Sequence, residues 1–252
     1  MTAAPTSRRV LLTPVLNEEA SGLPVLQVAA ALLHAGIVDE MVAADGGCTD
    51  GTTELVRRAG HRVIPPGAVS TLGKGGNVVH ALRSLDLRAD DCVLLLDADV
   101  HLAEPLAVGR LLDALVDGVA LVKADFGRLD PSGRHRRLRG GRVTELAARP
   151  LLAQVGPALA ALGQPLSGQI AARFGDLIAV DHLSHYALEI GMLLAMRERG
   201  TIREAFIGDL RNTQRDDLHL SRVAQDVVDG FFLATGSASR PGSRVQVLGV
   251  TP

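Results

Sequence analysis

The first half of the chain alternates strand-like apolar runs with segments of helical periodicity, and this alternation constrains the fold more than any other feature. The strand-like runs are RRVLLTPV (8–15), DEMVAAD (39–45), HRVI (61–64), CVLLLD (92–97) and VALVKADF (119–126). The segments with helical spacing are LPVLQVAAALLHAG (23–36), DGTTELVRRAG (50–60), GKGGNVVHALRSL (73–85) and PLAVGRLLDALVDG (105–118). This βαβα order predicts an α/β fold with a Rossmann-like, mainly parallel sheet flanked by helices.

The second half of the chain has a different character. An arginine-rich loop runs from Arg128 to Arg142, and helical spacing dominates after it. We expect helices at about 143–162, 185–199 and 216–234. The last residues are rich in Gly, Ser and Pro, which predicts a loose tail apart from RVQVLGV (244–250). We therefore divide the chain into residues 1–127, a more helical half at 128–234 of the same domain, and a flexible tail at 235–252.

Composition limits the classes to which the chain can belong. Its 252 residues are 47% apolar and 21% charged, which suits one large globular unit. The net charge is -2 and aromatic residues make up 2%, so we expect no nucleic-acid partner. No apolar stretch is long enough to predict a membrane span. The two cysteines, Cys48 and Cys92, form no disulfide framework, and we expect a cytoplasmic location.

Two acids, Asp97 and Asp99, end the apolar run CVLLLDADV. Carboxylates at the end of a buried strand are costly unless positive charge or water meets them. One interpretation is a strand end that reaches solvent. The other is a site for Mg²⁺ or Mn²⁺, which take oxygen ligands and often combine few protein carboxylates with substrate phosphates.

Polar groups also follow the two earlier strands of the predicted sheet. NEE (17–19) follows the first strand, and DGGCTD (45–50) ends the second. Ligands bind outside the carboxyl ends of the strands in open α/β sheets, so a single site at this edge is predicted. Asp45 could accept hydrogen bonds from a base or a ribose, whereas Asp50 could cap the following helix.

Three further features carry chemistry but have plain structural alternatives. Lys74 lies in TLGKGGN (71–77), where it could meet a phosphate, although the motif taken alone favours a flexible turn. GGRVTE (140–145) leads into a helix and suits a small anion, or is a solvated loop with Thr144 as the cap. Glu189 lies on an otherwise apolar helix. It either lies at the edge of that helix or binds sugar hydroxyls.

The order of these motifs is more specific than any one of them. PVLNEE, ADGGCTDGT, GKGGNVVHAL and LLLDADV follow one another as in nucleotide-sugar glycosyltransferases of the GT-A fold. LVKADF, GGRVTELAARPLL, QPLSGQIAAR and YALEIGMLL resemble glucosyl-3-phosphoglycerate synthase, a retaining family. The resemblance runs from about Arg9 to Val228 and implies a dimer that needs Mg²⁺ or Mn²⁺.

The resemblance implies a role for each matching residue. Residues 1–127 would bind the nucleotide sugar, and 128–234 the acceptor. The implied donor contacts are Pro14, Leu16, Asn17, Glu18, Asp45, Lys74, Asp97, Ala98, Leu166, Ser167 and Gly168, and the implied metal ligand is Asp99. The implied acceptor contacts are Gly141, Arg142, Val143, Thr144, Tyr186 and Asn212. The implied catalytic residues are Lys74 and Glu189.

Two stretches depart from the family pattern. In GDLRNTQRDDLHL (208–220), Asn212 or Thr213 stands where the family has a metal-binding histidine, and Gln169 stands where it has glutamate.

We expect a metal-dependent retaining transfer from a nucleoside-diphosphate sugar, UDP-glucose being favoured, to a small anionic acceptor such as 3-phosphoglycerate. The alternatives are a related enzyme of secondary metabolism with a GDP- or UDP-sugar and another acceptor, and a non-catalytic nucleotide-binding relative.

Overall fold

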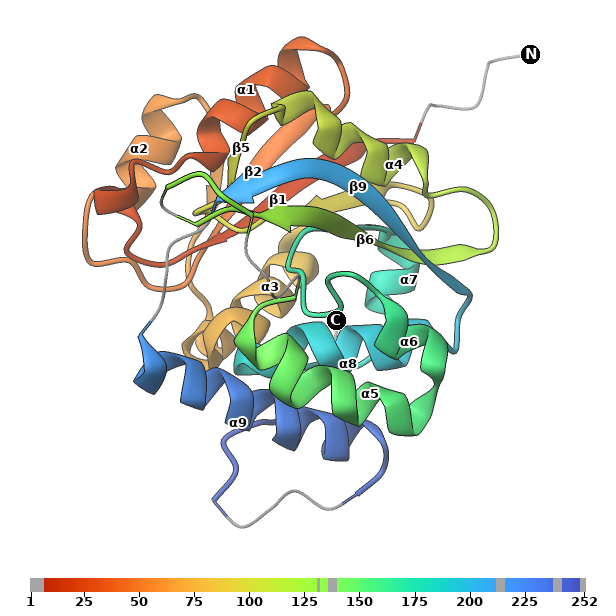
Figure 1. The fold of residues 1–252 in the computed structure, drawn as a ribbon. Helices are drawn as coiled ribbons and strands as arrows, with labels where there is room; N and C mark the ends of the chain where they lie inside the picture. Colours follow the sequence, from red (N-terminus) through yellow and green to blue (C-terminus); the bar gives the residue numbers. More distant parts are fainter. Residues whose placement is uncertain (1–6, 131, 136–139, 212–215, 238–241, 250–252) are drawn as a thin grey trace.

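The structure is a computed structural model that describes residues 7–130, 132–135, 140–211, 216–237 and 242–249. An eight-stranded sheet forms its centre, in the order β3-β2-β1-β4-β7-β6-β9-β5 (Figure 1). Its strands are β1 (Arg9–Val15), β2 (Glu40–Asp45), β3 (Arg62–Ile64), β4 (Cys92–Leu95), β5 (His101–Leu102), β6 (Val119–Arg128), β7 (Ile170–Arg173) and β9 (Thr201–Arg211). A separate two-stranded pair consists of β8 (His182–Leu183) and β10 (Val247–Leu248).

The sheet is mixed but mostly parallel, as the sequence predicts. β1 pairs in parallel with both β2 and β4, β2 pairs in parallel with β3, and β6 pairs in parallel with β9. β7 lies antiparallel between β4 and β6, and β5 is antiparallel to β9. The strands β1 to β4, β6 and β9 therefore all run in one direction, and their carboxyl ends meet at one edge of the sheet.

Helices cover both faces of the sheet. One face carries α1 (Val25–His34), α2 (Thr52–Arg58) and α4 (Arg110–Asp113). The other carries α3 (Gly73–Ser84), α5 (Arg149–Val155), α6 (Pro157–Ala161), α7 (Phe174–Ile178), α8 (Leu188–Met196) and α9 (Asp217–Ala234) (Figure 1). None of the helices in the described ranges is both long and apolar enough to cross a membrane.

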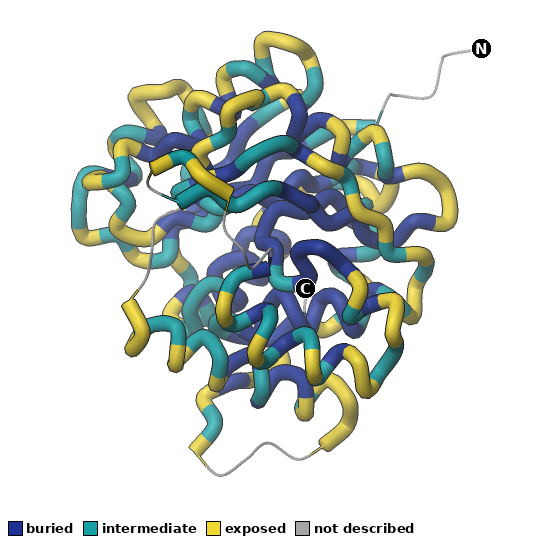
Figure 2. Tube along the Cα trace, viewed as in Figure 1, coloured by how far each residue is buried: buried dark blue, intermediate teal, exposed yellow. Residues whose placement is uncertain are grey.

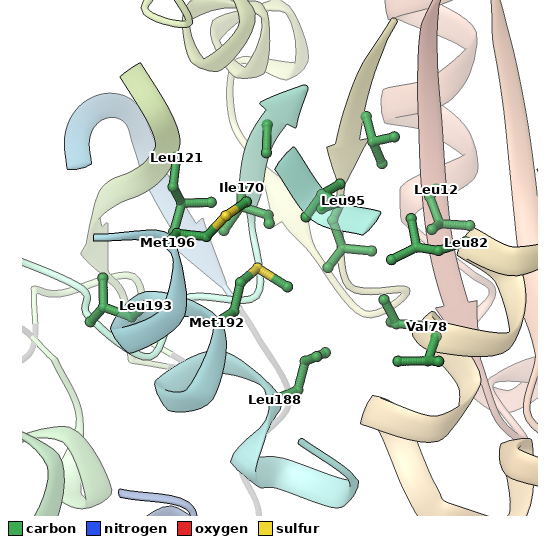
Figure 3. Close-up of a cluster of buried hydrophobic side chains, with 14 of the residues drawn as sticks. Leu12, Val78, Leu82, Leu95, Leu121, Ile170, Leu188, Met192, Leu193 and Met196 are labelled. Carbon is green, nitrogen blue, oxygen red and sulfur yellow. The ribbon is translucent and has the colours of Figure 1, made fainter. Parts of the chain in front are cut away.

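The strands β1, β2, β4 and β6 are buried on both faces over most of their length, which is why they read as mainly apolar runs (Figure 2). Leu12 of β1 and Leu95 of β4 face Val78 and Leu82 of α3, and Met192 lies on α8 in the same cluster (Figure 3). Burying each such aliphatic side chain contributes about 1.5–3 kcal/mol. This packing fixes α3 and α8 on one side of β4, and both helices carry residues of the site described below.

Most of the predicted elements are confirmed, but one predicted helix is much shorter and two strands were not predicted. The helix expected over 105–118 is reduced to a 3-10 turn, Pro105–Gly109, and the four-residue α4. The helices predicted at about 143–162, 185–199 and 216–234 are present, but the second half also supplies β7 and β9 to the sheet, which the sequence did not predict. β9 is a half-exposed strand without clean apolar alternation, and β7 has only four residues, so neither gives a strong strand signal.

Candidate active site

A cavity of about 180 Å³ opens at the carboxyl end of β4, and it collects residues from distant parts of the sequence. The predicted site residues that line it are Lys74, Asp97, Asp99, Leu166, Ser167, Gly168, Tyr186 and Glu189. Lining residues that the sequence analysis did not assign are Val100, Phe126, Arg128, Leu210, Val223 and Val227, together with Gln169, which was noted only as a departure. The cavity therefore lies at the edge of the sheet where the sequence predicts a site.

Lys74 joins the two halves of the chain inside this cavity. Its ammonium lies 2.5 Å from Asp97 Oδ1 and 2.5 Å from Glu189 Oε1. The Lys74 side chain is 16% exposed and that of Glu189 is 11% exposed, so solvent screens the contact weakly. Burial opposes the charged form of Lys74, but the two carboxylates outweigh it and hold the pKa of Lys74 well above 10.5. Lys74 therefore stays protonated and forms ion pairs with both acids.

A chain of hydrogen bonds fixes Asp97 from its other side. The Gln169 amide donates to Asp97 Oδ2 over 2.9 Å, and the Ser167 hydroxyl lies 2.8 Å from Gln169 Oε1. Gly168 lies close to the ion pair, because a Cβ there would be 2.5 Å from both Asp97 Oδ2 and Lys74 Nζ and would displace them. A neutral Gln169 suits this position, since its amide donates to a carboxylate.

Most of the residues predicted to bind the nucleotide lie at the carboxyl ends of β1 and β2 or directly after them. Asn17 has a φ of 54° and its side-chain oxygen accepts from the Thr49 N–H over 2.8 Å. Asp45 Oδ1 accepts from the backbone N–H groups of Gly47 and Cys48 over 2.9 and 2.8 Å. These bonds tie the loops after β1 and β2 together. Pro14 lies on β1, Leu16 and Glu18 follow β1, and Ala98 follows β4.

The glycines of the GKGG segment are needed for close packing. A Cβ on Gly75 would lie 2.1 Å from the Leu183 carbonyl oxygen and 2.8 Å from Ser184 Cα. The first turn of α3 is thus pressed against the chain that precedes α8, which places Lys74 beside Glu189. Of the two interpretations of these glycines, a flexible turn is wrong.

We expect Gly75→Ala to lower the free energy of unfolding by about 3 kcal/mol, because the backbone of two elements must separate. Urea denaturation followed by circular dichroism measures this. Gly156→Ala is the matched control, since a Cβ at Gly156 meets nothing within 4 Å and its φ of 176° suits any residue. Equal unfolding midpoints for the two variants would contradict the close packing.

The segment predicted to bind the acceptor lies outside the cavity but is connected to it. The Arg142 guanidinium forms an ion pair with Asp217, and Thr144 is buried. Gly141 has a φ of 80°, and a Cβ on it would lie 3.6 Å from the Arg128 guanidinium carbon. Arg128 therefore reaches from the cavity to this segment. Val143 leads into a π-helical turn, Thr144–Ala148, and Asn212 lies outside the described residues.

Tyr186 is held in the cavity by contacts from the C-terminal part of the chain. Its ring stacks edge-on against His219 with centroids 5.3 Å apart, and its backbone N–H donates to Asp226 Oδ2 over 3.3 Å. Arg244 binds both oxygens of Asp226 over 2.9 and 2.7 Å. Part of RVQVLGV, the segment set apart from the loose tail, forms β10 and pairs with β8. The C-terminal segment thus supports the turn that presents Tyr186.

Removing Arg244 should destabilise this support. Asp226 is 2% exposed, so Arg244→Ala leaves a buried carboxylate without its cation, and we expect a loss of about 1–3 kcal/mol. Thermal and urea unfolding measure it. Arg197→Ala, which removes a surface pair with Glu198, is the control and should change stability by less than about 1 kcal/mol. A loss no larger than in the control would show that the tail contributes nothing.

Comparison with known proteins identifies the family. No family model matches the chain. Glucosyl-3-phosphoglycerate synthase of Mycolicibacterium smegmatis is 37% identical over 238 residues, which span 90% of this chain and 77% of that protein. The chain belongs to the glucosyl-3-phosphoglycerate synthase family. As a member of this family it is a glycosyltransferase.

Solved structures of this family share the fold. The Mycobacterium tuberculosis glucosyl-3-phosphoglycerate synthase in complex with Mn²⁺, UDP and glucosyl-3-phosphoglycerate superposes with a TM-score of 0.80 at 30% identity, covering 93% of this chain and 82% of that one. The same enzyme with Mn²⁺, UDP-glucose and phosphoglyceric acid also has a TM-score of 0.80 at 30% identity, covering 93% and 81%. The predicted GT-A fold is therefore confirmed.

Proposed function

We propose that the chain transfers glucose from UDP-glucose to 3-phosphoglycerate in the cavity at the end of β4. The observation that carries the proposal is the cluster of Lys74, Asp97 and Glu189, which places a buried cation between two carboxylates in that cavity. The related M. tuberculosis enzyme has been solved with Mn²⁺, UDP-glucose and phosphoglyceric acid together. The 37% identical M. smegmatis relative carries the same activity in its name.

The donor set at the end of β4 fits a divalent metal. Asp97 and Asp99 both line the cavity, and the described residues contain no cluster of three metal-binding side chains. Mg²⁺ and Mn²⁺ accept few protein carboxylates when phosphate oxygens and water complete the shell. Asp99 would hold the ion, and Asp97 is engaged with Lys74 and Gln169. When bound, the ion would supply Lewis-acid stabilisation of the diphosphate.

Lys74 has the geometry to stabilise the leaving diphosphate. An ammonium has three N–H donors, and within the described part of the chain Asp97 and Glu189 account for two. The third can meet a phosphate oxygen as negative charge develops there. Glu189 has a second carboxylate oxygen with which to orient the sugar hydroxyls. Pro14, Leu16, Asn17, Glu18, Asp45 and Ala98 would line the nucleotide, and Leu166, Ser167 and Gly168 the sugar.

We assign the acceptor to the side of the cavity where Arg128 and Tyr186 lie. The anionic end of the acceptor would bind at Gly141–Thr144, where Arg142 would exchange Asp217 for the anion. The acceptor hydroxyl oxygen attacks the anomeric carbon, the bond from that carbon to the diphosphate oxygen breaks, and the hydroxyl proton passes to the departing phosphate. Positioning supplies much of the rate in such a reaction. Attack on the face that the diphosphate leaves would retain the anomeric configuration.

Calorimetric titration tests the donor assignment. We expect UDP-glucose to bind in the presence of Mn²⁺ or Mg²⁺, and GDP-glucose and metal-free UDP-glucose to bind at least about tenfold more weakly. If GDP-glucose binds more tightly than UDP-glucose, the proposed donor is wrong and GDP-glucose takes its place. Binding of UDP-glucose without turnover on any acceptor would instead support a nucleotide-binding relative that does not catalyse transfer.

We further propose a homodimer that forms through α9. Leu218, Ser221, Gln225, Val228 and Phe232 repeat at alternating spacings of three and four along this helix, as in a helix–helix seam. Leu218 is 64% exposed and Phe232 is 44% exposed. Light scattering after gel filtration should give twice the chain mass, and Phe232→Asp should give the single mass. A wild-type monomer at micromolar concentration would overturn the proposal.

We also place the protein in the cytoplasm. Cys48 and Cys92 are free thiols, and a reducing compartment keeps thiols in that state. Burial, the largest effect, raises the pKa of Cys48 to about 11, so this thiol is protonated at neutral pH. Fractionation of cells with an antibody against the chain tests the location.

A further inference from the structure

Lys123 is a buried cation that the proposed reaction does not use. It lies in the middle of β6, is 1% exposed, and is one of the largest fully buried side chains. Its ammonium donates to the Ser167 carbonyl oxygen over 2.8 Å. An apolar side chain of the same length would fill the space without the cost of desolvating a charge. Packing therefore does not explain a lysine at this position, whereas the bond to Ser167 does.

The segment that Lys123 contacts is the floor of the cavity. Leu166, Ser167 and Gly168 line the cavity, and the Ser167 N–H donates to the Gln164 carbonyl to close a turn. The Gln164 side chain is 1% exposed and donates to the Phe126 carbonyl of β6 over 3.1 Å. At the other end, the Gln169 carbonyl accepts from the Ala124 N–H. Lys123 thus holds the middle of a segment whose two ends are bonded to the same strand.

The charges around Lys123 connect it to the reacting groups. Glu189 of α8, Asp97 after β4 and Glu204 of β9 favour its ammonium, and Lys74 of α3 opposes it. Burial is the largest effect and lowers the pKa of Lys123 to about 8. The surrounding carboxylates therefore offset only part of the cost of burying this charge. A group kept at such a cost beside the cavity points to a role in the site.

We propose that Lys123 is a positioning residue for the donor sugar, acting through the Ser167 carbonyl to set where Leu166 and Gly168 meet it. The proposal rests on the sugar transfer proposed above. It separates two parts of donor binding. The segment that Lys123 supports is assigned to the sugar, whereas the loops after β1 and β2 are assigned to the nucleotide. Loss of Lys123 should therefore affect the sugar and spare the nucleotide.

The test uses the full-length chain and Lys123→Met, which keeps an unbranched side chain, shorter by one atom, and removes the donor. We expect kcat/KM for UDP-glucose to fall about 10- to 100-fold, because a small misplacement of the sugar is enough for such a loss. The Kd for UDP should stay within about threefold of the wild-type value, because the nucleotide contacts are retained. Val122→Ala is the matched control, since Val122 is fully buried on the same strand and belongs to the core cluster on the opposite face of the sheet.

The outcomes separate this inference from the proposed function. Wild-type protein without transfer would refute the function itself. A wild-type protein that transfers, with Lys123→Met equally active or no worse than Val122→Ala, would overturn the inference. A parallel loss of UDP binding would do the same, because it indicates a general disturbance. If Lys123→Met does not fold, Lys123→Gln repeats the test, and failure of both to fold would show that Lys123 supports the whole sheet and also overturn the proposal.

Discussion

Lys74→Met is expected to lower kcat/KM for sugar transfer by about 1,000-fold, the loss typical of removing a group that stabilises a developing negative charge. The substitution has two effects in the structure. It removes the cation that would meet the leaving diphosphate, and it leaves Asp97 and Glu189 without the ammonium that lies 2.5 Å from each. The first effect acts on the transition state. The second also lowers the free energy of unfolding, because two weakly exposed carboxylates lose their cation.

Release of UDP from UDP-glucose with acceptor present measures the loss. Arg58→Met is the control, since it removes a cation from an exposed pair with Glu54 on α2 and should leave turnover unchanged. Circular dichroism confirms that both variants are folded. A folded Lys74→Met protein that retains more than about a tenth of the wild-type kcat/KM would remove Lys74 from the catalytic role.

Asp99→Ala is expected to abolish the metal dependence of donor binding and to reduce transfer by at least about 100-fold. Asp99 lines the cavity with Asp97, but Asp97 is already engaged with Lys74 and Gln169, so it is a poor substitute ligand. In the wild-type protein, Mn²⁺ and UDP together should raise the thermal unfolding temperature more than UDP alone, because a ligand that binds only the folded state stabilises it. In Asp99→Ala this increment should vanish.

Asp113→Ala provides the comparison for this experiment. Asp113 is an exposed carboxylate on α4, on the other face of the sheet, so the Mn²⁺ increment should persist in that variant. An unchanged increment in Asp99→Ala would mean that another group holds the ion. The segment 208–220, in which the sequence departs from the family pattern, would then be the first place to look.

The fold of the first half could be predicted because its periodicity is clear. The runs that became β1, β2 and β4 are mainly apolar, and the segments between them have helical spacing. β7 and β9 could not be predicted in this way. β7 has four residues, and its place between β4 and β6 depends on antiparallel pairings that no local pattern encodes.

The sequence predicts individual residues of the site better than it predicts the contacts between them. Lys74, Asp97 and Glu189 each stood out, but their meeting depends on how closely α3 approaches the chain before α8, which Gly75 permits. Arg128 and Lys123 gave no signal of their own. An arginine in a basic loop is expected to be solvated. The role of a lysine inside an apolar strand cannot be inferred until its partner, the Ser167 carbonyl, is known.

Product formation tests the central claim most directly. The full-length chain is incubated with ¹³C-labelled UDP-glucose, 3-phosphoglycerate and Mn²⁺, and the products are identified by mass spectrometry and by the anomeric ¹³C signal. We predict labelled glucosyl-3-phosphoglycerate in the α configuration, with one UDP released for each product formed. Hydrolysis to free glucose, or transfer to other small anionic acceptors but not to 3-phosphoglycerate, would contradict the assignment of the acceptor. Failure to consume UDP-glucose under any metal condition would contradict the account as a whole.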